Sequence, residues 1–354
     1  MLDIVIIPLQ SFQTLGLYCS KMLKPLIRAI KIKPDYAITL LIFSVSIVIA
    51  YNYYLHVDQP YLEQRLEIHN QIIQGNADFP YRYRVLVPFI CEIAKRSFSF
   101  FLSNNRAFLL SYALYDLVSI FFLLTLLYVW VRTWFSREQA LIGILFVACT
   151  MPIALKDHYF QPWSLLECGL FTAGLLIIYK KRHLLLAFFT LIASLNKETA
   201  ILIPFVFLFS NLVTGNTFKS NNNINRNTML LFCIYLSIWA TVFLSLRYLR
   251  GYASINHINY IENLLSRNMS KESLLNTLVN GSLFLGIFWI FIPLGFKYAP
   301  AFIKQIAFII PFYLITIAVW GVWYEVRLLI TLYPIFVPLG LSFFFAKRNE
   351  EESI

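Results

Sequence analysis

Long apolar runs alternate with short polar connections along this chain, as is typical of helices that cross a membrane. A helix needs about 20 apolar residues to cross roughly 30 Å of hydrocarbon, and residues 36–55 form such a run. We expect further spans at 107–131, 139–155, 162–179, 184–195, 200–213, 228–246, 281–296, 306–320 and 328–345. The pattern therefore predicts an all-α polytopic membrane protein with about ten transmembrane helices.

The first polar connection, residues 56–106, has a pattern of its own. Apolar residues recur at helical spacing in 62–73, and Gly75 with Asn76 predicts the end of that helix. Residues 85–102 are apolar, yet Glu92, Lys95 and Arg96 near their middle would be costly at bilayer depth. We expect both stretches to form interfacial or re-entrant helices rather than spans.

The distribution of basic residues orients the spans. Basic residues precede the first span, and a cluster at 180–182 follows the fourth, so we expect these segments and both termini to be cytoplasmic. The organisation predicted is a cytoplasmic or interfacial segment 1–35, a single transmembrane domain 36–346 and a cytoplasmic tail 347–354. Loops 56–106, 156–162, 247–280 and 321–327 then lie together on the non-cytoplasmic face.

Composition supports a membrane protein and narrows its partners. Of the 354 residues, 59% are hydrophobic and only 13% charged, which is too little polar surface to cover a soluble globule. In so apolar a chain, the net charge of +11 indicates contact with anionic lipid headgroups and phosphates, not with nucleic acid. The five cysteines are scattered and predict neither a metal site nor a disulfide framework.

The polar insert 56–88 carries candidate chemistry. Arg82 and Arg84 alternate with Tyr81 and Tyr83, so an extended segment would direct both guanidinium groups to one side, where they suit a phosphate. The alternative is an anchor at headgroup level.

Carboxylates in the outer loops could take a proton from a hydroxyl group. Asp58, at the membrane edge, is the first candidate for such a base, and Asp78 is the second. Asp157 and His158 could orient an acceptor or hold a divalent ion, although one acid and one imidazole leave the metal undefined. Other charged residues at outer span ends either line the same site or form helix-end ion pairs; they are Lys197, Glu198, Arg247, Arg250, Glu325 and Arg327.

The order of these features resembles the GT-C membrane glycosyltransferases. An acid follows the first span, an interfacial helix ends in Gly before an aromatic-Pro-Tyr/Arg run, a second acid follows the third span, and a Leu-Asn-Lys turn follows the fifth. The similarity covers residues 36–213. On this resemblance Asp58 matches the first catalytic acid, Asp157 the second-loop acid, and Lys197 the lysine after the fifth span. The chain has His56-Val57-Asp58 where the family commonly has an Asp-Glu pair, and it lacks a large C-terminal soluble domain.

The resemblance implies an integral membrane enzyme of the bacterial inner membrane or an equivalent membrane. Such enzymes take a sugar from a polyprenyl-phosphate donor on the non-cytoplasmic face, here for an inverting transfer to a lipid or glycan acceptor. Asp58 is then the expected base, with Arg82 and Arg84 on the donor phosphate. Two alternatives stay open: a transporter or flippase of lipid-linked glycans, and a polysaccharide polymerase or acyltransferase. A nucleotide-sugar enzyme or an ATPase is not indicated, because the chain has no nucleotide-binding α/β pattern and no P-loop.

Overall fold

The computed structural model describes residues 34–155, 160–212, 226–252 and 257–351, and the regular secondary structure in these ranges is helical, without a strand. Six helices in this part of the chain are long and apolar enough to cross a membrane: Tyr36–Asp58, Asn104–Val131, Arg137–Ala154, Arg226–Arg250, Ala301–Trp320 and Val326–Phe345. The bent pair Lys271–Leu285 and Phe288–Gly295 would make a seventh. The all-α prediction is therefore confirmed for the described residues, and the long apolar helices indicate an integral membrane protein.

Three further expected spans coincide with shorter apolar helices, Trp163–Tyr179, His183–Asn196 and Glu198–Asn211. At 1.5 Å per residue, 17 residues reach about 26 Å, somewhat less than the hydrocarbon thickness. The number of spans predicted from the sequence thus exceeds the number that length and composition support here.

The chain divides into two compact units, Met1–Phe43 and Ser44–Ile354. The first contains the start of α2 (Pro34–Tyr53), and every residue discussed below belongs to the second.

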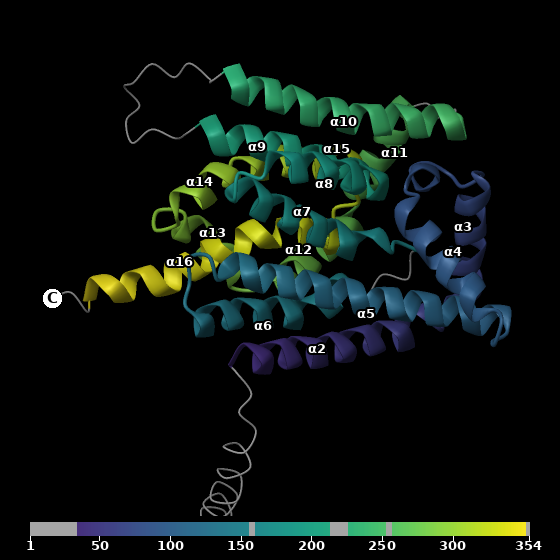
Figure 1. The fold of residues 1–354 in the computed structure, drawn as a ribbon, viewed down its shortest axis with the longest axis horizontal. Helices are drawn as coiled ribbons and strands as arrows, with labels where there is room; N and C mark the ends of the chain where they lie inside the picture. Colours follow the sequence, from purple (N-terminus) through teal and green to yellow (C-terminus); the bar gives the residue numbers. More distant parts are fainter. Residues whose placement is uncertain (1–33, 156–159, 213–225, 253–256, 352–354) are drawn as a thin grey trace, which may run out of the picture. The chain divides into compact units, whose positions relative to one another are not determined.

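Within the second unit, long helices lie side by side (Figure 1). Helix α5 (Asn104–Val131) packs against α6 (Arg137–Ala154) and α7 (Trp163–Tyr179), and α7 packs against α8 (His183–Asn196) and α9 (Leu202–Leu212). Helix α10 (Arg226–Arg250) lies along α8 and α9. Trp130 is fully buried in α5 and donates a 2.6 Å hydrogen bond to the carbonyl of Pro334 in α16 (Tyr333–Glu351). This bond connects α5 to the last helix of the unit.

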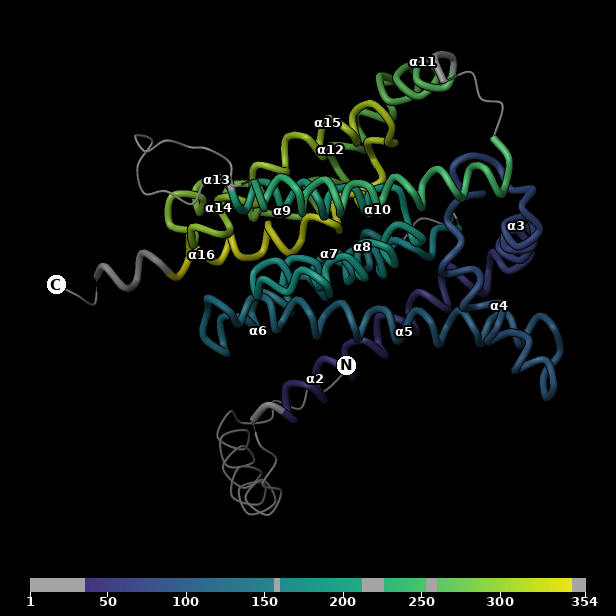
Figure 2. Tube along the Cα trace, turned by 45° about the horizontal axis from the view of Figure 1, so that its top comes forward, coloured from purple at the N-terminus to yellow at the C-terminus, as the bar shows by residue number. Residues whose placement is uncertain are grey.

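Two short helices, α3 (Leu62–Gln74) and α4 (Leu86–Phe98), gather at the end where α5 begins (Figures 1 and 2). Helix α3 ends at Gly75, which adopts φ 81°, a left-handed conformation that favours glycine. Helix α4 has 13 residues and reaches only about 20 Å, so it is too short to cross a bilayer. Both helices thus form where the sequence predicted them.

Buried His69 joins these helices to α5. Its Nδ1 lies 2.9 Å from the hydroxyl of Tyr112, and its Nε2 lies 3.0 Å from the carboxylate of Glu92. Glu92 also pairs with Lys95 and Arg96, so the charged residues of α4 are held together outside the long helices. Burial lowers the pKa of His69.

The range 247–280, expected as the longest outer loop, is mostly helical. The structure has α11 (His257–Asn268) and α12 (Lys271–Leu285) in this range. Ser270 caps α12 by accepting a hydrogen bond from the amide of Ser273. Helix α12 then bends by 67° into α13 (Phe288–Gly295), which packs closely on α16. Polar residues in this range favoured a loop, but they also suit a helix that has one exposed face.

Candidate functional site

Polar side chains from distant segments meet where α7 begins and α8 ends. Asn196, the last residue of α8, donates a 3.1 Å hydrogen bond to the carbonyl of Trp163, the first residue of α7. Tyr83 donates to the carbonyl of Gly251, just after α10, at 2.9 Å. These contacts bring the turn η2 (Tyr81–Tyr83), the turn η3 (Glu198–Ile201) and the end of α10 together.

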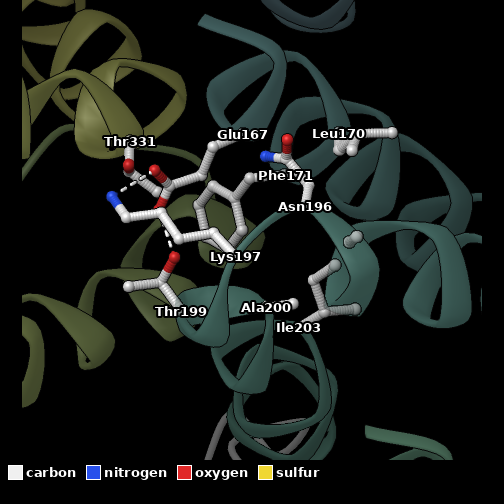
Figure 3. Close-up of a pocket in the computed structure, with 10 residues that line it drawn as sticks. Glu167, Leu170, Phe171, Asn196, Lys197, Thr199, Ala200, Ile203 and Thr331 are labelled. Atoms are coloured by element: carbon white, nitrogen blue, oxygen red, sulfur yellow. Dashed lines mark hydrogen bonds and ion pairs between the residues drawn. The ribbon is translucent and has the colours of Figure 1, made fainter. Parts of the chain in front are cut away.

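Lys197 is buried in the turn after α8 and forms an ion pair with Glu167 of α7. Its Nζ lies 2.6 Å from Glu167 Oε2, and both side chains are less than a tenth exposed. Thr199 donates a hydrogen bond to the other carboxylate oxygen, so the ammonium and the hydroxyl converge on one carboxylate, with apolar Phe171 beside it (Figure 3). Since breaking a buried pair leaves an uncompensated charge, this contact fixes the position of Lys197.

Arg84 and Glu198 form a second ion pair beside the first. Arg84 Nε donates to Glu198 Oε2 at 3.1 Å, and the guanidinium lies 5.0 Å from the ring centre of Trp163. The carbonyl of Glu198 accepts a 3.0 Å hydrogen bond from the indole of Trp239 in α10. The aromatic rings and the ion pair therefore fix the orientation of both side chains.

A cavity of about 600 Å³ opens next to these two pairs. Such a volume is typical of small-molecule sites. Its polar lining includes Arg84, Lys197, Glu198 and Arg247. The rest of the lining is largely apolar and aromatic. It comes from η2 and the residues just before it, the end of α10, α11, α15 (Ile309–Trp320) and η4 (Val326–Leu332). These residues are Phe79, Pro80, Tyr83, Phe243, Leu244, Tyr252, Tyr260, Tyr313, Ile317, Trp320 and Leu328.

Arg247 differs from the other two cations of this cavity. Among the described residues it forms no ion pair; its Nη1 donates to the carbonyl of Phe243, and its guanidinium lies 4.4 Å from the ring centre of Tyr83. Lys197 and Arg84 are each opposed by a carboxylate, so within the described part of the chain Arg247 supplies the positive charge of the cavity that no ion pair compensates. An anion with an apolar tail would suit this arrangement.

The segment with alternating tyrosines and arginines is not extended, and this part of the prediction was wrong. Residues 81–83 form a 3₁₀ turn, and the two guanidinium groups have different partners. Arg82 Nε donates to the carbonyl of Ala77 at 2.9 Å, whereas Arg84 reaches Glu198. Of these two arginines, Arg84 lines the cavity and Arg82 does not.

The neighbouring predicted residues have mainly structural contacts. Tyr81 accepts a 2.8 Å hydrogen bond from Gln161, and burial raises its pKa. Arg250 donates to the carbonyls of Ile72 and Arg82 and so anchors the end of α10 on α3 and η2. Arg327 of η4 pairs with Glu325, the residue just before that turn. Both side chains are at least nine-tenths buried, and neither lines the cavity.

Asp58, the expected base, lies in a buried ion pair. It ends the short helical turn η1 (Tyr54–Asp58), and its Oδ1 is 2.8 Å from Arg65 Nη2, with exposed fractions of 2% and 1%. Arg65 also donates to the hydroxyl of Tyr53 at 3.3 Å and stacks on Phe160 at 5.2 Å. Asp116 of α5 lies within electrostatic reach of this pair. Asp58 is thus enclosed by protein and is not part of the cavity lining.

The other two predicted acids lie elsewhere. Asp78 is exposed in the connection between α3 and η2 and does not line the cavity. Asp157 and His158 fall outside the described residues. Among the described residues, no group of three or more His, Cys, Asp or Glu side chains comes together as a metal site would require.

Sequence reasoning missed three kinds of residue. It gave no role to buried His69 or to buried Arg65 of α3, and it overlooked the aromatic wall of the cavity, such as Tyr313 and Trp320. An aromatic residue within an apolar run carries no signal that separates a cavity wall from a lipid-facing side.

Comparison with known proteins provides no family: no family model matches the chain, and neither does any curated protein or solved structure.

Proposed function

We propose that this protein is a membrane glycosyltransferase that takes a sugar from a polyprenyl-phosphate donor, and that the cavity beside Arg84, Lys197 and Arg247 holds the donor. The observation that carries the proposal is the pairing of an uncompensated cation, Arg247, with a large aromatic and aliphatic wall. A donor of this class has the same two parts, a phosphate and an isoprenoid chain, and aromatic rings also suit the sugar that the phosphate carries.

The chemistry needs charge compensation where the bond breaks. When the bond between sugar C1 and the phosphate oxygen breaks, the leaving phosphate gains negative charge, which nearby cations stabilise. Arg247 is placed to bind the phosphate, while Lys197 and Arg84 add positive potential from their ion pairs. In this proposal the acceptor is a lipid or glycan hydroxyl. The proposal also includes about ten spans, namely the six long helices, the bent pair and the three shorter apolar helices, with the site on the non-cytoplasmic face of a bacterial inner membrane or an equivalent membrane.

The test is transfer by the purified protein in lipid nanodiscs, supplied with radiolabelled polyprenyl-phosphate sugars and a membrane extract as the source of acceptor. We expect label to leave the lipid fraction. Arg247→Met removes a charge-assisted contact, each of which contributes about 1.5–3 kcal/mol, so donor should bind roughly 10- to 150-fold more weakly. Arg106→Met is the matched control, because Arg106 is exposed on α5 outside the cavity lining.

Two results would contradict the proposal. Donor affinity in Arg247→Met equal to that of the control would remove the phosphate site from this cavity. Intact labelled lipid that crosses the bilayer of proteoliposomes, with no sugar released, would replace the glycosyltransferase with a flippase.

A further inference from the structure

One carboxylate of the cavity wall, that of Glu198, has an oxygen available to a ligand. Glu198 Oε2 accepts the hydrogen bond from Arg84, but Oε1 has no hydrogen-bond partner among the described residues. A buried polar atom without a partner costs about 1–3 kcal/mol, so a ligand that donates a hydrogen bond to Oε1 would be stabilised there. Glu198 lines the cavity, and a hydroxyl group bound there is the natural donor to Oε1.

The other acids of the chain are less suited to reach a substrate in this cavity. Of the described residues that line it, Glu198 carries the one carboxylate. Glu167 is occupied by Lys197 and Thr199, and Asp58 is enclosed with Arg65. The geometry thus selects Glu198 and not the acid that the sequence favoured.

The surroundings of Glu198 orient it as a base requires. Arg84 donates a hydrogen bond to Oε2, and the indole of Trp239 donates one to the backbone carbonyl of Glu198. These two contacts fix the orientation of the carboxylate and therefore of Oε1. Arg247 lines the same cavity and lies within electrostatic reach of Glu198, which puts the cation for the leaving phosphate near the base. A fixed base close to the anion site is the arrangement that transfer to a hydroxyl group requires.

We propose that Glu198 is the general base of the transfer and that its substrate is a neutral hydroxyl acceptor, an inference that rests on the proposed function. Oε1 accepts the proton of the acceptor hydroxyl while the acceptor oxygen forms a bond to sugar C1. The bond between C1 and the phosphate oxygen breaks, and its electron pair leaves with the polyprenyl phosphate. The products are the glycoside, the lipid phosphate and protonated Glu198, which then returns its proton to water.

The experiment compares Glu198→Gln with the wild type in nanodiscs and measures donor affinity and turnover separately. The glutamine keeps an oxygen for Arg84 but cannot take a proton. Since general base catalysis contributes about 10²- to 10⁴-fold, we expect turnover to fall by that factor while donor affinity stays within about threefold, the loss thus appearing in kcat. Glu63→Gln, the same change at an exposed position of α3, should leave both unchanged.

Two further readouts separate a base from a structural residue. The wild type should lose turnover on the acid side of its pH profile as the base is protonated, and the residual turnover of Glu198→Gln should lack this limb. Azide is a nucleophile that needs no deprotonation, so it should form glycosyl azide with Glu198→Ala at a rate close to that of the wild type.

The outcomes distinguish this inference from the proposed function. No transfer by the wild type means that the proposed function has failed. Transfer by the wild type, with Glu198→Gln turning over within about threefold of it, overturns the base alone. Loss of donor affinity in Glu198→Gln as large as the loss of turnover also overturns it, because Glu198 would then bind donor or maintain the fold. Absence of azide rescue where donor still binds is the third contrary result.

Discussion

Arg65 offers a sharp test of burial, because the protein contains a second arginine in an ion pair of the same length. The Arg65–Asp58 and Arg96–Glu92 pairs both measure 2.8 Å, but Arg65 is 1% exposed and Arg96 is 74% exposed. Replacing either arginine by leucine removes one cation and keeps much of the apolar side chain. The two substitutions differ in what surrounds the carboxylate left behind: Glu92 is 15% exposed and keeps His69 and Lys95 as partners, whereas Asp58 is 2% exposed and keeps no ion-pair partner among the described residues.

The expected magnitudes differ severalfold. Breaking a buried pair from one side costs about 3–5 kcal/mol, and Arg65→Leu also leaves Asp116 without its nearby cation. That free energy corresponds to a factor of roughly 150 to 5,000 in the unfolding equilibrium. An exposed pair contributes about 0–1 kcal/mol, so Arg96→Leu should shift the same equilibrium by at most about fivefold.

The assay is equilibrium unfolding in mixed micelles of fixed composition, followed by tryptophan fluorescence, with a linear extrapolation to zero denaturant. Asp58→Asn combined with Arg65→Leu removes one of the uncompensated charges, so the double variant should be more stable than Arg65→Leu alone. If Arg65→Leu lowers the free energy of unfolding no more than Arg96→Leu, the burial argument is refuted. If the double variant is less stable than Arg65→Leu, the charge argument is refuted.

Two further predictions concern packing and pH. Burial lowers the pKa of His69 below its ordinary 6.5. Burial alone would raise the pKa of Glu92, but hydrogen bonds from His69 and Arg96 lower it to about 2. The unfolded chain therefore binds both protons more readily, so stability should fall as pH drops below about 6.5, and again below about 4.5. His69→Gln should flatten the first decline in thermal unfolding, and an unchanged profile would contradict this origin. A Cβ on Gly295 would lie 1.8 Å from a backbone oxygen of α16, so Gly295→Ala should cost about 1–3 kcal/mol; Gly281→Ala meets nothing within 4 Å and serves as the control.

The long helices were readable from the sequence because their signal is local. An apolar run of 25 residues at 107–131 leaves little choice but a helix, and α5 occupies Asn104–Val131. Gly75 likewise predicted the end of α3 through its own backbone freedom. These features depend on neighbouring residues alone, so they need no knowledge of tertiary packing.

The site was less predictable because it depends on contacts between distant segments. Asp58 and Arg65 lie seven residues apart with a break in the helix between them, and nothing local shows that both become enclosed. Glu198 was noted as one of several charged residues at span ends. Its unpartnered oxygen and its place on the cavity wall become visible only when η2, η3 and α10 are brought together.

The arginine and tyrosine alternation shows how a pattern can mislead. A period of two suits a strand, in which alternate side chains share a face. Residues 81–83 instead make a 3₁₀ turn, which rotates Arg82 away from Arg84. Periodicity over four residues is too short to decide between these conformations.

Helix α10 has a consequence for how the cavity responds to its surroundings. Only 6% of the residues in its most apolar stretch are buried by protein, although Phe243, Leu244 and Arg247 line the cavity. Where α8 and α9 do not cover it, the helix surface is therefore left for hydrocarbon chains. Lipid then borders the helix that forms one wall of the cavity, and we expect donor binding to depend on the thickness and composition of the bilayer.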